Sequence, residues 1–253
     1  MAKQKGIIKL DGTIGGVTFY KTKDGYLAKE KSSIPADRIA NDPAFQRTRE
    51  NGAEFGRAGK AGKTLRTALR ALLQNTADSR MVSRLTQKMM EVIKLDETNP
   101  RGLRNVIDGE AELLEGFEFN ISGKLGTTLY APFTAVINRV AGTLTVGLVA
   151  FIPQNMIAAP AGATHFKIIS AGAEVDFENE SFVSETNESG VLPWDNNATA
   201  VINLANAVTA NSTHPLFLAL GIEFYQEVNT QMYPLKNGAF NALSLVKVSG
   251  AVV

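Results

Sequence analysis

The spacing of hydrophobic and polar positions changes along this chain near residue 116. Before that point apolar residues recur at helical spacing, as Met81, Leu85, Met89 and Val92 do within 78–95. From Phe117 onward the period is two, and short apolar runs alternate with clusters of Gly, Pro, Asn and Ser. The predicted strands lie at 144–152, 165–170, 198–204, 216–225 and 243–248. The pattern predicts an α+β fold whose C-terminal part is an antiparallel β-sandwich, with a barrel as the alternative.

The first thirty residues predict a small β-ribbon. The runs Val17–Tyr20 and Tyr26–Ala28 flank Lys23-Asp24-Gly25. This is a hairpin signal because glycine accepts the positive φ that such turns require.

Helices are predicted between the ribbon and residue 116. Asp42 followed by Pro43 is typical of an N-cap with proline at the first helical position. The helix that follows extends to about Leu73, and its glycines predict a break or close helix packing between Gly52 and Gly62. A further helix is expected from Pro100 to about residue 116.

Charge is divided at nearly the same place as the hydrophobic pattern. Residues 1–112 contain 21 Lys and Arg against 14 Asp and Glu, whereas residues 113–253 contain 5 against 11, so +7 and −6 give the net +1. We therefore expect two domains, a basic ribbon and helical region at 1–116 and an acidic β-sandwich at 117–253. Such asymmetry favours an anionic partner for the basic part or attraction between copies, although two domains can also simply differ in composition.

A basic face is predicted on the long helix. On a helical wheel Phe55, Ala58, Leu65, Leu69, Leu72 and Leu73 share the buried side, and the opposite side carries Lys60, Lys63, Arg66 and Arg70. The alternatives are a solvated face, docking onto an acidic surface and binding of nucleic acid. Aromatic residues that would stack bases are not interleaved with these cations.

An acidic column is predicted farther along the chain. Carboxylates spaced two apart on a strand share one face, which here carries Glu174, Asp176, Glu178 and Glu180. The four like charges require solvent, a cation such as calcium, or the basic face of another subunit. A glycosidase pair is a further alternative, without sign of a cleft.

Several kinds of chemistry have no support in the sequence. The chain has no cysteine, and Gly62-Lys63-Thr64 lacks the first glycine and the leading strand of a P-loop. His165 and His214 form no zinc-binding pattern, and serine never occurs as G-x-S-x-G. Trp194 predicts a core or interface contact, with sugar stacking as the alternative. No catalytic, metal or cofactor-binding residue is predicted.

The N-terminal motifs resemble those of an uncharacterised family of bacterial proteins. They are Gly12-Thr13-Ile14-Gly15-Gly16-Val17-Thr18-Phe19-Tyr20-Lys21 and a helix start of the form P-x-x-Q-x-x-R at Pro43, Gln46 and Arg49. The resemblance covers about the first 115 residues. It implies the same division into ribbon, helices and an immunoglobulin-like β-rich domain, and it implies no activity.

These patterns together favour a non-enzymatic structural protein whose partners are copies of itself. The basic helical and ribbon face of one subunit would meet the acidic sandwich face of the next, and packed termini would add to the contact, giving a filament or tube. Nucleic-acid binding and surface recognition of a glycan or protein are the alternatives. No run is long and apolar enough to span a membrane, and the first residues lack the apolar core of a Sec signal peptide. A cytoplasmic location or a non-Sec route is therefore expected.

Overall fold

The structure is a computed structural model that describes residues 1–31 and 34–252, with the backbone alone for residues 236 and 237. It divides into two compact units, Met1–Glu50 and Asn51–Val253. The predicted boundary at 116/117 therefore differs from the observed one. The physical reason is that helical residues before 116 and sheet residues after it share one hydrophobic core.

The first unit contains a four-stranded antiparallel sheet in the order β1-β4-β3-β2. Its strands are β1 (Ala2–Lys3), β2 (Gly12–Ile14), β3 (Val17–Thr22) and β4 (Gly25–Glu30). Thr22 pairs with Gly25, which has a φ of 111°, so the predicted hairpin is confirmed. Every residue of this sheet is exposed or half-buried.

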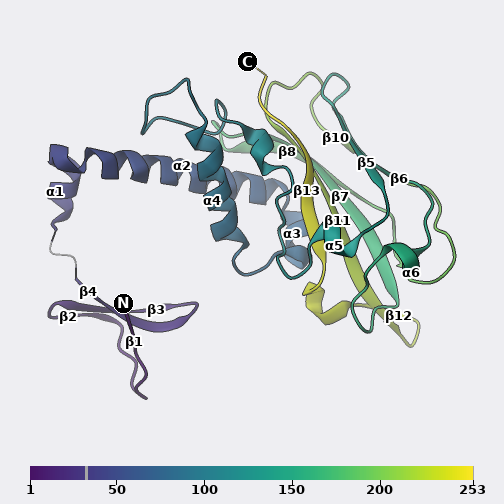
Figure 1. Ribbon diagram of the computed structural model, residues 1–253, viewed down its shortest axis with the longest axis horizontal. Helices are drawn as coiled ribbons and strands as arrows, with labels where there is room; N and C mark the ends of the chain where they lie inside the picture. The colour runs from purple at the N-terminus through teal and green to yellow at the C-terminus, as the bar shows by residue number, and fades with distance from the viewer. Residues whose placement is uncertain (32–33, 253) are drawn as a thin grey trace. The chain divides into compact units, whose positions relative to one another are not determined.

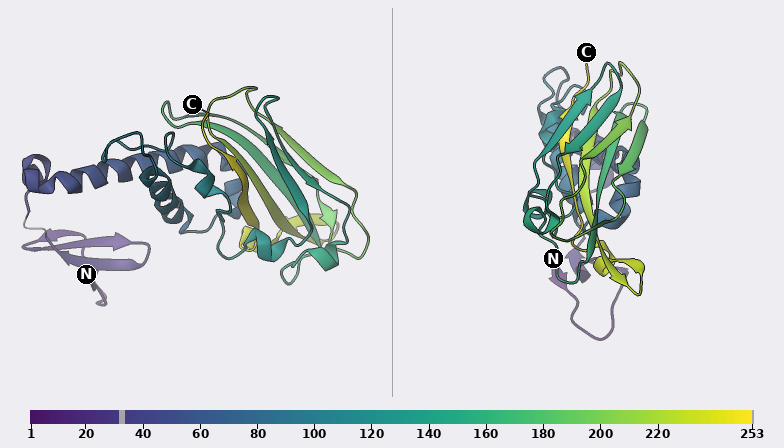
Figure 2. Two further views of the ribbon diagram at one scale, coloured as in Figure 1. Left: turned by 45° about the horizontal axis from the view of Figure 1, so that its top comes forward. Right: turned by 90° about the vertical axis from the view of Figure 1, so that its right-hand side faces the viewer.

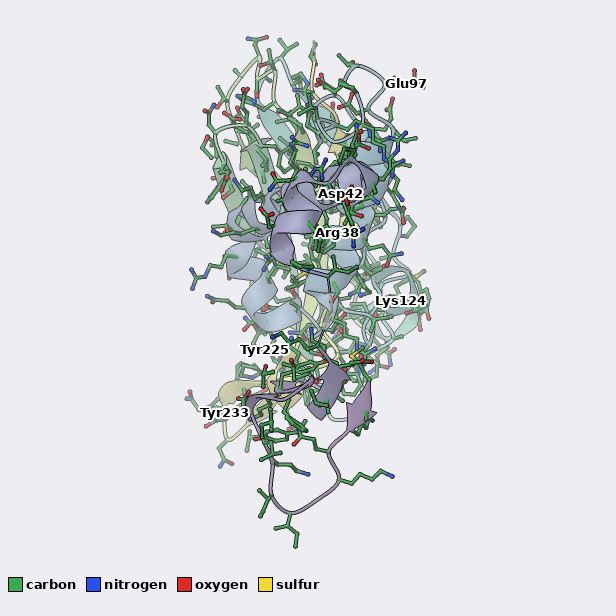
Figure 3. The ribbon with its side chains drawn as sticks, turned by 90° about the vertical axis from the view of Figure 1, so that its left-hand side faces the viewer. Arg38, Asp42, Glu97, Lys124, Tyr225 and Tyr233 are labelled. Carbon is green, nitrogen blue, oxygen red and sulfur yellow. The ribbon has the colours of Figure 1, made fainter. Side chains whose placement is uncertain are left out.

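The first unit continues into helices α1 (Ala36–Asn41), the 3₁₀ turn η1 (Pro43–Phe45) and the start of α2 (Gln46–Ala68). The Asp42 carboxylate accepts a hydrogen bond from the Ala44 backbone N–H at 2.9 Å, and Pro43 occupies the first helical position. The predicted cap is confirmed. Asp42 also forms an ion pair with Arg38 at 3.1 Å (Figure 3).

Helix α2 is continuous, so the predicted break between Gly52 and Gly62 does not occur. The alternative, close helix packing, holds at Gly62. A Cβ added there would lie 3.7 Å from Cγ of Leu85 on helix α4 (Met81–Lys94). That distance is ordinary van der Waals contact, so the two helices pack together at Gly62 but an alanine would also fit there.

The helices of the second unit are α2, α3 (Arg70–Thr76) and α4 (Met81–Lys94). The helix predicted from Pro100 to about residue 116 is wrong, because only the 3₁₀ turn η2 (Ala111–Leu114) forms there. The buried carboxylate of Asp96 instead organises the preceding segment, accepting hydrogen bonds from the backbone N–H groups of Thr98, Asn99 and Asn105 at 2.9 Å each. These side chain–backbone bonds replace a helical ladder.

Two antiparallel sheets form the rest of the second unit, as predicted for a sandwich-like region. In the described residues one sheet has the order β10-β6-β5, and the other contains β12-β11-β7-β8 with β13 paired to β11 and β9 to β7. The elements are α5 (Leu125–Thr128), β5 (Phe133–Asn138), β6 (Thr143–Leu148), α6 (Pro153–Met156), β7 (His165–Asp176), β8 (Ser181–Glu188), β9 (Leu192–Pro193), β10 (Ile202–Ala207), β11 (Leu216–Val228), β12 (Gln231–Pro234), η3 (Leu235–Gly238) and β13 (Ala242–Ser249).

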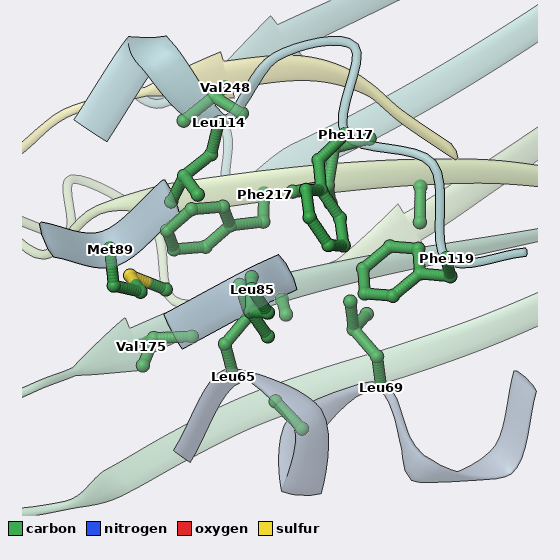
Figure 4. Packing of buried hydrophobic residues seen from close by; sticks show 14 of the residues in the cluster. Leu65, Leu69, Leu85, Met89, Leu114, Phe117, Phe119, Val175, Phe217 and Val248 are labelled. Carbon is green, nitrogen blue, oxygen red and sulfur yellow. The ribbon is translucent and has the colours of Figure 1, made fainter. Parts of the chain in front are cut away.

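The second unit has three layers, with the larger sheet in the middle (Figure 1, Figure 2). On one side Leu65 of α2 and Leu85 and Met89 of α4 pack with Val175 of β7 and Phe217 of β11 (Figure 4). On the other side a second apolar core lies between the two sheets. Strands β7 and β11 are therefore buried on both faces, which is why the helices and the sheet form one unit rather than two.

Candidate functional site

In the predicted basic face Lys60, Lys63 and Arg70 are exposed and Arg66 is half-buried, with Arg70 on α3 rather than α2, and most of the apolar side is buried. Ala58 and Leu65 are fully buried, whereas Lys60 and Lys63 lie at the surface. Phe55 is an exception, because its side chain is 61% exposed. Up to residue 57 the only buried α2 residue is Glu54, so this part of the helix has no apolar partner to cover Phe55.

Three of the four basic residues line one groove, which we call the basic groove. It has a volume of about 490 Å³ and is lined by Lys63, Arg66, Thr67, Arg70, Leu73, Gln74, Ala77 and Met81. Within the described residues no carboxylate forms an ion pair with Lys63, Arg66 or Arg70. The groove thus combines a mixed lining, apolar at Leu73, Ala77 and Met81 and polar at Thr67 and Gln74, with three positive charges that no carboxylate pairs.

The fourth basic residue, Lys60, is paired within its own chain. Its ammonium lies 3.2 Å from the carboxylate of Glu180, with side chains 71% and 43% exposed. Both residues line a cleft of about 520 Å³, together with Arg57, Asp108 and Phe177. The charge complementarity predicted between subunits is therefore partly satisfied inside one molecule.

The predicted acidic column does not form, because β7 ends at Asp176 and the chain then turns. Glu174 and Asp176 are both buried rather than solvent-facing. Glu178 and Glu180 follow in the turn and are exposed, and Glu180 has a φ of 53°. The alternating side-chain directions of a strand therefore place only Glu174 and Asp176 on one face, and other residues cover that face.

Both buried carboxylates accept hydrogen bonds from neighbouring groups. Glu174 accepts from the Ser212 hydroxyl at 2.7 Å and from the Thr209 backbone N–H at 3.1 Å. Burial acts to raise the pKa of Glu174, but these donors outweigh it and hold the pKa below its ordinary value. Asp176 likewise accepts from backbone N–H groups of the turn, at 2.9 Å from Glu178 and 3.0 Å from Asn179. Neither carboxylate is free to bind another subunit or a cation.

The exposed acidic surface instead follows strand β8, which the sequence pattern did not predict. Its eight residues are exposed or half-buried and include Glu185 and Glu188. Glu185 accepts a hydrogen bond from the Ala207 backbone N–H, and Glu188 forms an ion pair with Lys167 at 2.8 Å. The strand was missed because Ser, Glu, Thr and Asn dominate it, and its two apolar residues, Phe182 and Val183, are adjacent and give no alternating pattern.

The histidines and Trp194 have structural contacts. His165 Nδ1 lies 2.9 Å from the Thr164 hydroxyl, and His214 Nε2 lies 3.9 Å from Asp176. Residues 1–31 and 34–252 contain no cluster of three or more His, Asp or Glu that could hold a metal ion. The Trp194 indole N–H donates to the Ile157 carbonyl at 3.3 Å, and its ring packs against the core between the sheets.

The other tempting motif, Gly62-Lys63-Thr64, lies inside the continuous helix α2. The Thr64 hydroxyl donates to the Lys60 carbonyl at 3.2 Å, a bond within the helix. A phosphate-binding loop needs successive backbone N–H groups free to face the ligand. Helical hydrogen bonding occupies those groups here.

Comparison with known protein families, with curated proteins and with solved structures found no match. None of the helices in the described part of the chain has the length and apolar character needed to cross a membrane. By its helices and antiparallel sheets the chain is an α+β protein with a β-sandwich-like region. The resemblance to an uncharacterised bacterial family stays a prediction.

Proposed function

We propose that this chain is a non-enzymatic structural protein that associates with copies of itself through its N-terminal sheet. Repetition of one such heterologous contact between successive copies generates a filament or tube when the rotation does not close.

The exposure of the N-terminal sheet carries this proposal. Across residues 1–31 no side chain is buried, and large apolar groups face solvent, including Ile7 (103% exposed), Ile8 (80%) and Ile14 (63%). Small sheets need a covered apolar face for stability, because backbone pairing alone is marginal in water. An exposed apolar surface of this kind is typical of a segment that a partner covers.

Charge supports a second copy of the chain as that partner. Residues 1–31 contain seven Lys against three Asp and Glu, a net of +4. The second unit carries Glu178, Glu180, Glu185 and Glu188 on and beside β8, of which Glu180 and Glu188 also pair with Lys60 and Lys167 of their own chain. Opposite charges on two parts of one chain attract between copies and speed their association.

The test is the mass of the full-length protein by size exclusion with light scattering over a range of concentrations, with negative-stain microscopy of the largest species. We expect oligomers that grow with concentration. Association should be slower at 0.15 M salt than at low salt, because attraction between exposed charges is screened beyond about 8 Å there.

A pair of matched variants tests the role of the N-terminal sheet. Ile7→Asp with Ile8→Asp should abolish the oligomers, whereas Val140→Asp with Val149→Asp should leave them unchanged. Val140 and Val149 are 73% and 62% exposed and lie in the second unit. A full-length protein that stays monomeric at every concentration would refute the proposal.

The basic groove supports a second candidate function, binding of nucleic acid. Lys63, Arg66 and Arg70 have no carboxylate partner in the described residues, so they can meet phosphates without first breaking an ion pair. Release of counterions would make the affinity fall steeply with salt. A gel-shift titration should lose its signal with Lys63→Glu plus Arg66→Glu, and an unchanged shift excludes this candidate.

A further inference from the structure

Strand β8 has an edge with unpaired backbone groups. Its one ladder partner is β7, with Ser181 opposite Asp176 and Glu188 opposite Ile169. Along an antiparallel strand the backbone N–H and C=O groups point alternately toward and away from the partner strand. The Ser189 N–H donates to the Ile168 carbonyl, so Ser189 and every second residue before it point toward β7. By that alternation Phe182, Ser184 and Thr186 turn their N–H and C=O groups away from β7.

These outward groups have no backbone partner among the described residues. Strand β10 approaches the same edge through side chains instead. Asn187 Nδ2 donates to the Ala205 carbonyl at 2.7 Å, and Glu185 accepts from Ala207. The β8 ladder positions are therefore available to another strand.

On the opposite side of the same sheet the edge of β13 is covered by residues 116–119, whereas the short strand β12 is exposed. Along β13 the Leu245 carbonyl accepts from the Gly116 N–H at 2.7 Å, and the Leu243 carbonyl accepts from the Phe119 N–H at 2.9 Å. Leu245 in turn donates to the Phe117 carbonyl at 3.1 Å. Proteins usually block exposed edges because such edges recruit other strands.

The side chains of the β8 edge indicate the chemistry of an added strand. Phe182 and Val183 are 40% and 48% exposed, and acidic residues lie on the strand and in the turn before it. The edge strand β5 of the smaller sheet, by comparison, has the sequence Phe-Thr-Ala-Val-Ile-Asn and carries no charge. The β8 edge therefore selects a segment that is both apolar and basic.

One segment of this chain has that composition and is itself unpaired. Residues 5–10 have the sequence Lys-Gly-Ile-Ile-Lys-Leu and lie between β1 and β2. No backbone–backbone hydrogen bond of residues 5–9 is present in the described structure. Side chains hold the segment: Lys9 Nζ donates to the Gly6 carbonyl at 2.6 Å, and the Gln4 side chain accepts from the Leu10 N–H at 2.9 Å and donates to the Leu10 carbonyl at 3.3 Å. Pairing with another strand would break no backbone–backbone bond of residues 5–9, and it would replace the side-chain bonds at Gly6 and Leu10.

We propose that the β8 edge accepts residues 5–10 of a second copy as an added strand. Main-chain hydrogen bonds supply the pairing, Ile7 and Ile8 meet the apolar groups of Phe182 and Val183, and Lys5 and Lys9 meet the acidic surface. This inference rests on the proposed self-association and names the surface that carries it.

The absence of cysteine from the chain allows a direct test by disulfide trapping. The test uses three single-cysteine proteins, Ile8→Cys, Ser184→Cys and, as the control on the edge strand β5, Val136→Cys, together with a chain that carries both Ile8→Cys and Ser184→Cys. The Ile8→Cys protein carries a size tag, so that a mixed dimer is distinguished from a homodimer on a denaturing gel. Each pair is mixed under native conditions and oxidised mildly.

We expect a mixed dimer from Ile8→Cys with Ser184→Cys and at least about a tenfold lower yield with Val136→Cys, because disulfides form only between Cα atoms within about 7 Å. Oligomers that trap equally at both strands, or at Val136→Cys alone, would overturn the β8 assignment while leaving self-association intact. A doubly substituted chain that crosslinks internally, with no mixed dimer, would show that the segment pairs within its own chain and would also overturn it. Failure of self-association itself appears separately, as monomers in light scattering.

A second measurement uses proline to block the edge. Ser184→Pro removes an outward N–H without touching the bonds to β7, whereas Ser184→Ala keeps the N–H and removes the hydroxyl. Ser184→Pro should raise the dissociation constant of the oligomer about tenfold or more, and Ser184→Ala should leave it within about twofold. Circular dichroism confirms that both variants fold, and equal affinities in folded variants would overturn the proposal.

Discussion

Replacing Glu54 by alanine removes a buried carboxylate that joins α2 to the segment after α4. The side chain is 1% exposed and accepts three hydrogen bonds: from the Gly102 N–H at 2.8 Å, from Arg104 Nε at 2.8 Å and from Arg104 Nη2 at 2.9 Å. Glu54→Ala leaves the Arg104 guanidinium, whose side chain is 19% exposed, without its counter-ion.

The expected loss of unfolding free energy is about 3 kcal/mol. Breaking a buried ion pair by removing one partner costs roughly 3–5 kcal/mol, and the partial exposure of Arg104 favours the lower end. Glu91→Ala is the matched control, because its ion pair with Lys88 has a similar distance of 2.7 Å but side chains 44% and 34% exposed. An exposed pair of this kind contributes at most about 0.5 kcal/mol.

The assay is urea unfolding followed by circular dichroism, repeated as a function of pH. The hydrogen bond from Arg104 holds the pKa of Glu54 below its ordinary value of 4.5. The stabilisation is therefore fully present above pH 4.5 and is lost as pH falls through the lower folded-state pKa. Equal losses for Glu54→Ala and Glu91→Ala at pH 7, or a difference that persists unchanged at pH 2, would refute the reasoning.

Three further predictions concern the second unit. Leu85→Ala should cost roughly 3–5 kcal/mol in urea unfolding, because Leu85 is fully buried between α2 and the sheet; a loss under about 1 kcal/mol would mean that the core collapses around the cavity. Gly142→Ala should cost more than about 2 kcal/mol, because Gly142 has a φ of 65° and an added Cβ would lie 2.5 Å from the Val208 carbonyl oxygen. Gly126→Ala, with open space around it, should leave the thermal midpoint unchanged or raised. Glu174→Lys should lower the thermal midpoint by many degrees because it buries an unpaired charge, whereas Glu178→Lys at the exposed turn should leave it nearly unchanged, and similar midpoints would contradict the burial difference.

Local chemistry made several elements of this fold predictable from sequence. The turn at Asp24-Gly25 and the cap at Asp42 depend on residues within a few positions of each other, and the structure confirms both. The face of α4 that carries Leu85 and Met89 likewise follows from helical spacing, and both side chains are fully buried. These features need no knowledge of distant partners.

The surfaces of the molecule depended on contacts between residues far apart in the chain. Alternation placed Glu174 and Asp176 on one strand face, but it could not show that this face is covered, and residues such as Ser212 cover it only after folding. The pairing of Lys60 with Glu180 likewise joins positions 120 residues apart.

The division of the chain into Met1–Glu50 and Asn51–Val253 likewise depends on contacts between residues far apart in the sequence. The sequence by itself determined where most helices and strands form, because hydrogen bonding and periodicity along the chain are local. Only the tertiary structure decided that helices α2–α4 share a core with the larger sheet and that β8 is left at its edge. The physical reason is that an apolar face must be buried, while the sequence pattern does not specify which distant element covers it.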